Sequence, residues 1–464
     1  MTLRLSTYAI GLPLSGEREL LIHGYTGAAL ALEAPVARRL RELPAGFDCE
    51  SSGLAPEHVA ALVDCGLFTE RSPEQESRVA ANLAESLHRA SRKRSQFVIM
   101  PTYNCNLRCP YCFQRDVRND DQMDYWRVLE TAQIDAIFAA IARLQPAEKG
   151  GGIITLYGGE PLHPGSVAAV EEVVRRAEAM GYSFYVVTNG VALARFKHLL
   201  GPGRLAHLQI TVDGPPWLHD QRRIGVRGNG SFTAIAAGID LALARGARVT
   251  ARTNVDRDNL PHLQELAELY HARGWLDHPL FSSYVRPVHS FSLGDADTVS
   301  HAELAGTVDE IRRRYPGGKA LEHGKDVRGR LKALLRHGAG ALTSHYCGGH
   351  CNQYIFDAHG NLYACWDDVG RPARRIGTYC PELTIDQAAA GEWFGRSVAA
   401  APACSTCPYA LLCGGGCGYS AREASGSIYG PACDDFPAML NRYADLAYRE
   451  VVHANGDDEE RREC

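Results

Sequence analysis

Three cysteines in the stretch "PTYNCNLRCPYCFQ" (101–114) have a spacing suited to a metal centre. Cys105, Cys109 and Cys112 follow the pattern C-x3-C-x2-C. Thiolates bind zinc, or iron in iron–sulfur clusters. Structural zinc takes four N or S ligands, so a zinc knuckle here would need a fourth ligand from elsewhere in the chain. The alternative is a four-iron cluster held at three irons, because an open coordination position marks catalytic rather than structural metal sites.

Eight further cysteines crowd into the last quarter of the chain and also indicate metal binding. Eight thiolates suffice for two four-iron clusters with four cysteines each. A zinc ribbon is the alternative, since C-x2-C pairs also serve zinc. The eight are Cys347, Cys351, Cys365, Cys404, Cys407, Cys413, Cys417 and Cys433, and the remaining cysteines, Cys49, Cys65, Cys380 and Cys464, are scattered.

The composition favours metal binding over disulfides. The N-terminus lacks a basic region followed by a long apolar run, and no run of about 18 apolar residues occurs, so we expect neither a signal peptide nor a spanning helix. We therefore expect a cytoplasmic protein, in whose reducing compartment fifteen cysteines favour metal ligation. The net charge of −5 gives no indication of nucleic acid or an anionic membrane as partner.

Short apolar strands alternate with amphipathic helices in the middle of the chain, and these elements must position the first three cysteines. Continuous apolar strands of this kind indicate a parallel sheet buried on both faces. About six βα units predict an α/β fold, a partial (β/α)6 TIM-like barrel over 93–320, with its active site at the carboxyl ends of the strands. The expected strands lie in 95–103, 151–161, 183–190, 205–215, 248–256 and 280–289.

The two ends of the chain do not share this alternation. Residues 1–92 read as short strands, two helices and a strand, which predicts a small α+β or winged-helix-like module. Over 321–450 the Cys and Gly content rises and periodicity fades, as expected where metal clusters replace a hydrophobic core. The charged tail 451–464 is predicted to be disordered.

Taken with its neighbours, the opening motif resembles that of the radical SAM superfamily. The three cysteines follow a strand, and Tyr111 directly precedes the third. The resemblance extends to further segments at strand ends, in an order and spacing that match the family. These are "GGEP" (Gly158, Gly159, Glu160 and Pro161), "TNG" with Asn189, "TVDGP" with Asp213, and "HDQRR" with Arg223 and its rival Arg222.

The resemblance implies a cofactor role for each of these segments. "GGEP" would meet the methionyl amino group of S-adenosylmethionine, and Arg223 would lie near its carboxylate. The amino and carboxylate groups of the cofactor would chelate the fourth iron. The family generates a 5′-deoxyadenosyl radical that removes a hydrogen atom from the substrate, while the protein positions the reacting carbon and excludes water.

The cysteines of the last quarter resemble a SPASM domain, the C-terminal extension of many peptide-modifying radical SAM enzymes. The run C-x2-C-x5-C-x3-C over 404–417 is specific to that pattern. The resemblance implies two auxiliary [4Fe-4S] clusters, three clusters in all. If all eight cysteines ligate, neither auxiliary cluster has an open iron, and both would serve to accept an electron; which of Cys347 and Cys351 is the stronger ligand stays open. The first would take Cys347, Cys351, Cys365 and Cys417, and the second Cys404, Cys407, Cys413 and Cys433.

SPASM enzymes mostly act on peptides, which implies a maturase of ribosomally synthesised peptides. The order of elements in 1–92 resembles the PqqD-like module that captures a leader peptide as an added strand; a structural cap on the barrel is the alternative. The expected partners are a precursor peptide and an electron donor such as flavodoxin or ferredoxin. The favoured reaction installs a thioether, C–C or C–O crosslink.

Three alternatives remain. In sulfatase maturases, which form formylglycine, an Asp commonly follows the cysteine of Gly-x4-Cys; here Trp366 follows Cys365, and Asp367 and Asp368 come next as candidate proton acceptors. Peptide epimerisation would need Cys380 or Cys65 as hydrogen donor. A protein of a different class, a non-catalytic Fe–S or zinc protein that binds peptides, would not cleave S-adenosylmethionine.

Overall fold

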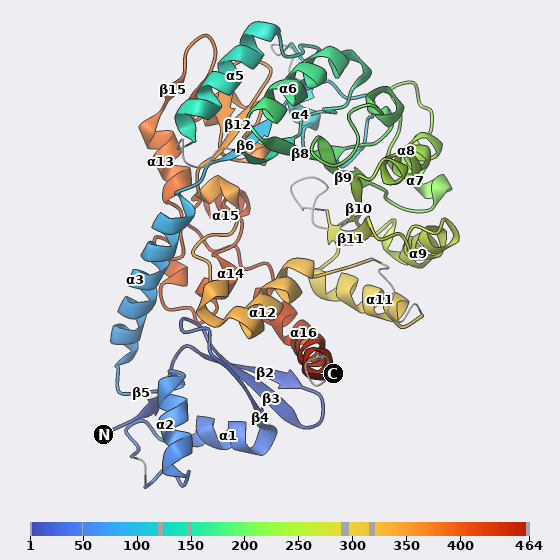
Figure 1. The fold of residues 1–464 in the computed structure, drawn as a ribbon. Coiled ribbons are helices and arrows are strands. Elements are labelled where there is room, and N and C mark those ends of the chain that lie inside the picture. Colours follow the sequence, from blue (N-terminus) through green and yellow to red (C-terminus); the bar gives the residue numbers. More distant parts are fainter. Residues whose placement is uncertain are drawn as a thin grey trace. The chain divides into compact units, whose positions relative to one another are not determined.

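The computed structural model divides the chain into two compact units (Figure 1). The first, here called the sheet unit, comprises Lys93–His323 and Asn352–Phe394. The second, the composite unit, is assembled from Met1–Arg92, Gly324–Cys351 and Gly395–Cys464. The structure describes residues 2–48, 50–118, 124–145, 151–288, 297–314 and 321–460, so Cys49 and Cys464 lie outside the described residues.

Six parallel strands form the centre of the sheet unit, which confirms the predicted α/β fold with a central parallel sheet (Figure 1). Their spatial order follows the chain, as in successive βα units. The strands are β6 (Gln96–Ile99), β7 (Gly152–Leu156), β8 (Tyr182–Thr188), β9 (Leu205–Thr211), β10 (Arg248–Val255) and β11 (Phe281–Pro287). The connecting helices include α4 (Arg115–Arg118), α5 (Thr131–Leu144), α6 (Val167–Ala179), α7 (Pro216–Arg222), α8 (Phe232–Ala244), α9 (Leu263–Ala272) and α11 (His301–Arg314).

Residues 352–394 extend this sheet past β6. Strand β12 (Gln353–Phe356) pairs in parallel with β6, and antiparallel pairs then add three short strands. The sequence placed this segment within the C-terminal Cys-rich region. It instead belongs to the same sheet as β6, the strand that leads into the three-cysteine loop. The added strands are β13 (Asn361–Tyr363), β14 (Gly377–Thr378) and β15 (Thr384–Ile385), and α13 (Gln387–Gly395) follows them.

Side chains alternate between the two faces of the central strands. In β9, Leu208 and Ile210 are fully buried, and Ile210 lies close to Ile235 of α8 around Gly190. Gln209 lies between these two residues in the chain. It is polar and points to the opposite face, because the side-chain period of a strand is two. The helix-covered face thus forms the core, and the other face carries polar groups.

The composite unit begins with a three-stranded antiparallel sheet in the order β2–β3–β4. A two-stranded pair, β1–β5, and three helices complete residues 1–92, and Ser72 and Gln75 form a capping box at the start of α3. The elements are β1 (Arg4–Leu5), β2 (Ala9–Leu14), β3 (Arg18–His23), β4 (Ala29–Glu33), α1 (Ala34–Glu42), α2 (Pro56–Asp64), β5 (Phe68–Thr69) and α3 (Pro73–Ser91).

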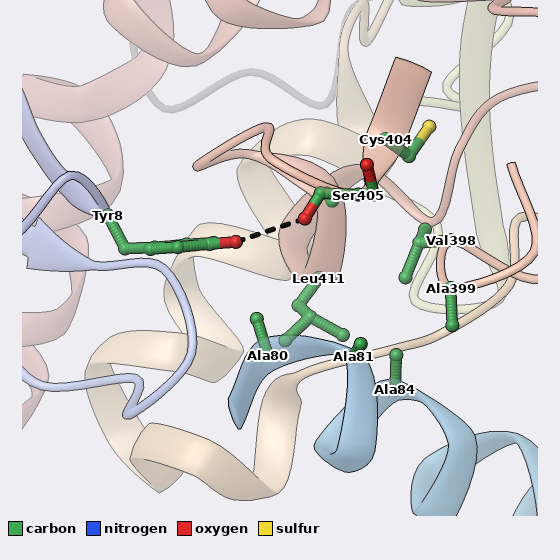
Figure 2. Close-up of a pocket in the computed structure, with 10 residues that line it drawn as sticks. Tyr8, Ala80, Ala81, Ala84, Val398, Ala399, Cys404, Ser405 and Leu411 are labelled. Carbon is green, nitrogen blue, oxygen red and sulfur yellow. Dashed lines mark hydrogen bonds between the residues drawn. The ribbon is translucent and has the colours of Figure 1, made fainter. Parts of the chain in front are cut away.

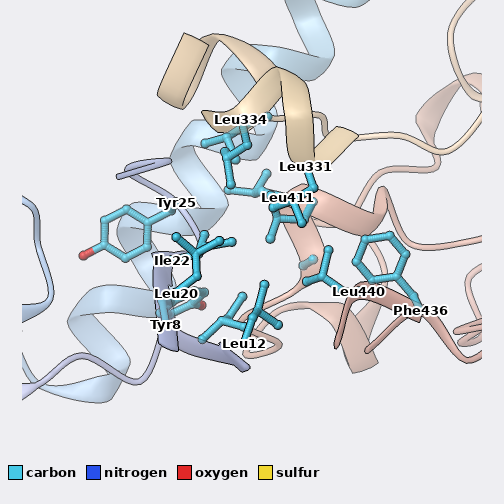
Figure 3. Close-up of a cluster of buried hydrophobic side chains, with 14 of the residues drawn as sticks. Tyr8, Leu12, Leu20, Ile22, Tyr25, Leu331, Leu334, Leu411, Phe436 and Leu440 are labelled. Atoms are coloured by element: carbon cyan, nitrogen blue, oxygen red, sulfur yellow. The ribbon is translucent and has the colours of Figure 1, made fainter. Parts of the chain in front are cut away.

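One hydrophobic core joins these strands to the two later segments of the composite unit (Figure 3). Its members include Leu12, Leu20 and Ile22 of β2 and β3 and Leu331 and Leu440 of the later helices, all at most 2% exposed. The four-part division into 1–92, 93–320, 321–450 and 451–464 stays a prediction. The later helices are α12 (Lys325–His337), α14 (Ala410–Cys413), α15 (Gly418–Ser425) and α16 (Phe436–Glu460).

Helix α16 extends into the segment 451–464, whose predicted disorder stays a prediction. Helix α16 continues to Glu460, so residues 451–460 belong to it. An established helix extends without a new nucleation step, and this allows a charged sequence to stay helical. Residues 461–464 lie outside the described part of the chain.

Candidate cofactor and cluster sites

The three-cysteine loop leaves the carboxyl end of β6 and lies against the end of β7. The backbone N–H of Gly159 donates to the Thr102 carbonyl at 3.2 Å, and that of Glu160 donates to Asn104 at 2.8 Å. A Cβ on Gly159 would lie 2.0 Å from the Tyr103 carbonyl oxygen. The glycine of "GGEP" is therefore required by close contact with the cysteine loop.

Glu160 ties together the ends of β7 and β8. Its buried carboxylate accepts hydrogen bonds from Thr188 Oγ1 at 2.5 Å, from the Asn189 N–H at 2.6 Å and from the Leu162 N–H at 2.9 Å. Burial raises the pKa of Glu160, although these three donors oppose the rise. Both carboxylate oxygens are used within the protein, so Glu160 holds the strand ends in place.

Asn189 connects the end of β8 to the cysteine loop. Its Nδ2 donates to Asn106 Oδ1 at 2.7 Å and lies 3.8 Å from Cys105 Sγ. Its Oδ1 accepts from the Val191 N–H at 3.0 Å, which fixes the amide orientation. The second and third strand ends thus both contact the loop that carries the thiols.

The end of β9 meets the loop through a buried network of Tyr111, Asp213 and Arg223. The Tyr111 hydroxyl donates to Asp213 Oδ2 and accepts from Arg223 Nη1 at 3.0 Å. Asp213 Oδ1 also accepts from the Asn254 N–H at 2.9 Å. The rival Arg222 pairs with Asp256 at 2.7 Å and lies over the Tyr111 ring, 5.1 Å from its centroid. Both arginines therefore face the cysteine loop, and Arg223 is the one that hydrogen-bonds to the Tyr111 hydroxyl.

Arg223 acts electrostatically on the Cys109 thiol, and its Nε is unused. Burial raises the pKa of Cys109, and the Arg223 charge opposes that rise. Burial also raises the pKa of Cys105 to about 12, with Cys109 and Cys112 among its charged neighbours. Arg223 Nε is buried without a hydrogen-bond partner among the described residues, and so is Arg222 Nε. Such a donor fits a carboxylate supplied by a bound ligand.

These donors fit a cluster chelated by an amino acid carboxylate. No three His, Cys, Asp or Glu side chains in the described ranges converge on one point, as the ligands of a single ion would. A four-iron cluster does not need such convergence, because each thiolate binds a different iron. Iron ligation keeps thiols deprotonated despite their raised pKa values.

Tyr157, directly after β7, brings part of the 352–394 segment next to the loop. Its ring contacts Trp366 edge-on, with centroids 4.3 Å apart, and stacks on Phe113 at 6.2 Å. Burial raises the pKa of Tyr157, and Asp367, Cys112 and Cys365 add to the rise. Asp367 and Cys112 therefore both lie within electrostatic range of the Tyr157 hydroxyl.

Asp368 is placed differently from Asp367. It is fully buried, its N–H donates to the Cys365 carbonyl at 3.3 Å, and its charge acts on the pKa of Tyr363. Of the two predicted proton acceptors, Asp367 acts on the pKa of Tyr157 and Asp368 on that of Tyr363, and the catalytic role of both stays a prediction.

The polar face of the sheet carries residues that no sequence motif indicated. Gln209 Oε1 accepts from the hydroxyls of Tyr185 at 2.9 Å and Tyr284 at 2.7 Å. Arg252 Nε donates to Asn254 Oδ1 at 2.9 Å, and its charge acts on both Tyr157 and Tyr185. The available signal was the recurrence of polar residues at every second position of otherwise apolar strands.

In the composite unit, Cys404 lies within electrostatic range of the other three cysteines predicted for the second auxiliary cluster. Burial raises the pKa of Cys404 to about 11, and its charged neighbours include Cys407, Cys413 and Cys433. Four thiolates would match the ligand number of a four-iron cluster, and this ligand set stays a prediction.

The set predicted for the first auxiliary cluster is divided between the two units. Burial raises the pKa of Cys347 to about 12, and Cys417 is the neighbour with the largest effect after burial. The Cys351 thiol lies near Ser91 and Arg92, and donates to the Cys347 carbonyl at 3.8 Å. Cys365 belongs to the sheet unit. Of Cys347 and Cys351, it is therefore Cys347 that has Cys417 as its main charged neighbour.

A small cavity of about 10 Å³ lies beside Cys404 (Figure 2). Alanines of α3 line it, including Ala80 and Ala84, and the Tyr8 hydroxyl donates to the Ser405 carbonyl at 3.2 Å. Small apolar side chains make the surroundings of this thiol apolar, which suits an iron–sulfur cluster.

Comparison with known sequences gives one family and several named relatives. Residues 99–270 match the model of the radical SAM superfamily. Molybdenum cofactor biosynthesis protein 1 of Drosophila melanogaster is 27% identical over 59% of this chain and 46% of its own length. GTP 3',8-cyclase of Nitrobacter winogradskyi is 26% identical over 64% of this chain and 85% of its own length. The match thus spans less than half of the Drosophila protein.

Solved structures with similar folds were determined with peptides. Native anSMEcpe with bound AdoMet and Cp18Cys peptide has a TM-score of 0.57 and 14% identity, over 78% of this chain and 99% of that one. Streptococcus suis SuiB bound to precursor peptide SuiA has a TM-score of 0.50 and 12% identity, over 92% and 98%. At these identities the likeness concerns the fold.

The described helices include none that is both long and apolar enough to cross a membrane.

The three-cysteine loop and the ends of β7, β8 and β9 all fall within the matched range 99–270. Family match, fold and buried donors agree on a site for S-adenosylmethionine and one [4Fe-4S] cluster. Residues 99–270 therefore form a radical SAM domain.

Proposed function

We propose that this radical SAM enzyme modifies a precursor peptide and installs a crosslink, with two auxiliary clusters that accept an electron. The observation that carries the radical chemistry is the three-thiol loop, whose Cys109 is buried within electrostatic range of Arg223, an arginine whose Nε has no partner among the described residues. When bound, the cluster and S-adenosylmethionine supply a 5′-deoxyadenosyl radical that removes a hydrogen atom from the substrate.

Each residue of the site has a defined task in this proposal. Cys105, Cys109 and Cys112 hold the cluster. Arg223 binds the cofactor carboxylate, because a buried guanidinium forms strong charge-assisted hydrogen bonds with carboxylates. Tyr111 and Asp213 position Arg223, and the "GGEP" turn and Asn189 fix the loop.

Asp367 is the proposed proton acceptor. It lies beside Tyr157, whose surroundings also include Cys112. A carboxylate near the hydrogen-abstraction site can remove the proton that a substrate radical releases when it is oxidised and the new bond forms. The electron released in that step goes to an auxiliary cluster.

The sheet of residues 1–92 supports a peptide substrate. In the described chain, β4 pairs with β3 on one side only, and its residues are half-buried or exposed. An edge strand of this kind can accept a leader peptide through main-chain hydrogen bonds. SuiB, whose similarity extends over 92% of this chain, was solved with a precursor peptide.

The decisive experiment is anaerobic reconstitution, reduction with dithionite and addition of S-adenosylmethionine. We expect 5′-deoxyadenosine from the wild type. The Cys105→Ala, Cys109→Ala and Cys112→Ala triple variant should form none, yet keep about two-thirds of the iron, because the two auxiliary clusters remain. Cleavage by the triple variant would contradict the assignment of the site. Incubation with the peptide encoded next to the gene then tests the reaction: a mass loss of two hydrogens supports a crosslink, whereas an unchanged mass indicates epimerisation.

A second candidate is chemistry on a purine nucleotide, because relatives named GTP 3',8-cyclase match 64% of this chain. The polar face of the sheet offers Arg252 as a binding group for a phosphate. Incubating the reduced enzyme with GTP and S-adenosylmethionine tests this candidate. Substrate-dependent loss of GTP would favour it over the peptide.

A further inference from the structure

Arg396 is a fully buried arginine without an acidic partner. It is 0% exposed and lies in the composite unit, just after α13. Within the part of the chain that the structure describes, no carboxylate forms an ion pair with it. Burying a charge is strongly unfavourable unless an opposite charge compensates it, so the absence of an acid requires another source of negative charge.

Backbone carbonyls satisfy the hydrogen-bond donors of Arg396. Nε donates to Ile428, Nη1 to Gly416 at 2.9 Å, and Nη2 to Gly415 at 2.8 Å and to Gly430 at 3.4 Å. These dipoles orient the guanidinium and hold the glycine-rich turn that separates Cys413 from Cys417. They do not neutralise its charge.

Four cysteines lie within electrostatic range of this guanidinium, and they become anionic when they bind iron. Burial lowers the pKa of Arg396, and Cys404, Cys347, Cys417 and Cys413 oppose that change. Two of them, Cys347 and Cys417, belong to the first predicted auxiliary set, and the other two belong to the second. One cation thus lies within range of both sets.

The glycine turn 414–416 is shaped around this arrangement. All three glycines have positive φ, at 78°, 83° and 70°. A Cβ on Gly415 would lie 3.5 Å from Arg396 Nη1 and 3.7 Å from Cys404 Sγ, and a Cβ on Gly416 would lie 1.7 Å from the Ala432 carbonyl oxygen. The turn therefore brings the guanidinium and a thiol of the second set to the same glycine.

We propose that Arg396 is the shared counter-charge of the two auxiliary clusters and keeps both at a higher reduction potential than a neutral residue would. The inference rests on the proposed function, because it requires that the clusters are present. Four thiolates give a cubane a net negative charge, and each electron added increases it. A fixed nearby cation therefore favours the reduced form, as net charge and local electrostatics set cluster potentials.

The test compares purified, reconstituted Arg396→Gln and Arg396→Lys with the wild type and with Arg38→Gln, a change at an exposed arginine of α1. Iron per chain and an EPR-monitored redox titration are the two measurements. We expect Arg396→Gln to retain the iron of the wild type and to lower the equilibrium constant for auxiliary-cluster reduction at least tenfold, which is about 59 mV for one electron. Arg396→Lys keeps the charge and should stay nearer the wild type than Arg396→Gln, while Arg38→Gln should not differ from the wild type.

The outcomes separate this inference from the proposed function. Auxiliary potentials unchanged in Arg396→Gln, with full iron, would overturn the inference and leave the proposed function intact. If Arg396→Gln fails to retain iron, the auxiliary-cluster reduction potentials of Arg396→Lys test the inference instead. Potentials equal to those of the wild type support the role of the charge, and a large shift refutes it. A wild type with iron for only one cluster would overturn the auxiliary clusters themselves.

Discussion

The two groups of cysteines differ in how the protein compensates the cation beside them. In the sheet unit, Arg223 shares a network with Tyr111 and Asp213, and one of its donors stays unused. In the composite unit, the donors of Arg396 are met by main-chain carbonyls, and four cysteines lie within range of its charge. The first arrangement suits the reception of a ligand that arrives and leaves, and the second suits a permanently enclosed cluster.

The largest expected effects come from filling the glycine contacts at each site. Gly159→Ala should force the cysteine loop away from β7, because its Cβ would meet the Tyr103 carbonyl oxygen at 2.0 Å. We expect loss of about one-third of the iron and of S-adenosylmethionine cleavage, with one of three clusters missing. Gly416→Ala should instead remove auxiliary iron and preserve cleavage. Iron analysis and 5′-deoxyadenosine assays measure both, and an identical pattern in the two variants would break the comparison.

The proton acceptor should come next in size. Asp367→Asn should reduce peptide product formation about 10²- to 10⁴-fold, the range for loss of a general base, while 5′-deoxyadenosine still forms. Asp368→Asn, at a residue buried on the Tyr363 side, should not uncouple the two products in this way. Quantifying both products by mass spectrometry checks this prediction, and equal effects of the two substitutions would remove Asp367 from its proposed role.

Arg223→Gln should weaken S-adenosylmethionine binding about 10- to 100-fold, as expected for the loss of a hydrogen bond to a charged group. Arg227→Gln, at an exposed residue of the following loop, is the matched control. Equilibrium binding to the reconstituted enzyme gives both affinities. Equal affinities would mean that the unused donor has no role in ligand capture.

Acid should weaken the composite unit through His23, which is buried and hydrogen-bonded to Ser6. Burial lowers the pKa of His23 to about 4 from 6.5, so the folded state favours the neutral ring. This contribution, up to about 3 kcal/mol, is complete above pH 6.5 and is lost as the pH falls towards 4. Thermal unfolding at several pH values should show this slope, and His23→Gln should flatten it.

The smallest expected effect concerns the polar face of the sheet. Tyr284→Phe removes one of the two hydroxyls that donate to Gln209 Oε1. This change should lower the free energy of unfolding by about 1 kcal/mol. Chemical denaturation of the variant measures this value. A much larger change in substrate affinity than in stability would show that the face contacts the substrate.

Sequence patterns predicted the sheet unit better than the composite unit, for physical reasons. Apolar strands alternating with helices imply a parallel sheet, and motifs at strand ends then meet at one edge. Gln209 and Arg252 were missed because residues that meet across neighbouring strands leave no local motif. The contribution of 352–394 to the sheet was missed because its strands are only two to four residues long.

The composite unit resists prediction because its core forms from segments far apart in the chain. Cysteine spacing indicated ligand sets, but the glycine turn 414–416 and Arg396 lie in stretches without periodicity. The composition of Arg396's surroundings follows from the tertiary fold alone, since its carbonyl partners extend from Gly415 to Gly430.

The composite unit is built from three separate segments of the chain, and this affects when it can fold during synthesis. The apolar residues of β2 and β3 emerge first, but their partners in α12 follow roughly 300 residues later, which is roughly 15–60 s at ribosomal elongation rates. The first segment of the sheet unit can pair its strands one after another during that interval. One face of the amino-terminal sheet stays uncovered until α12 is synthesised. The core of the composite unit is therefore among the last parts of the protein to fold.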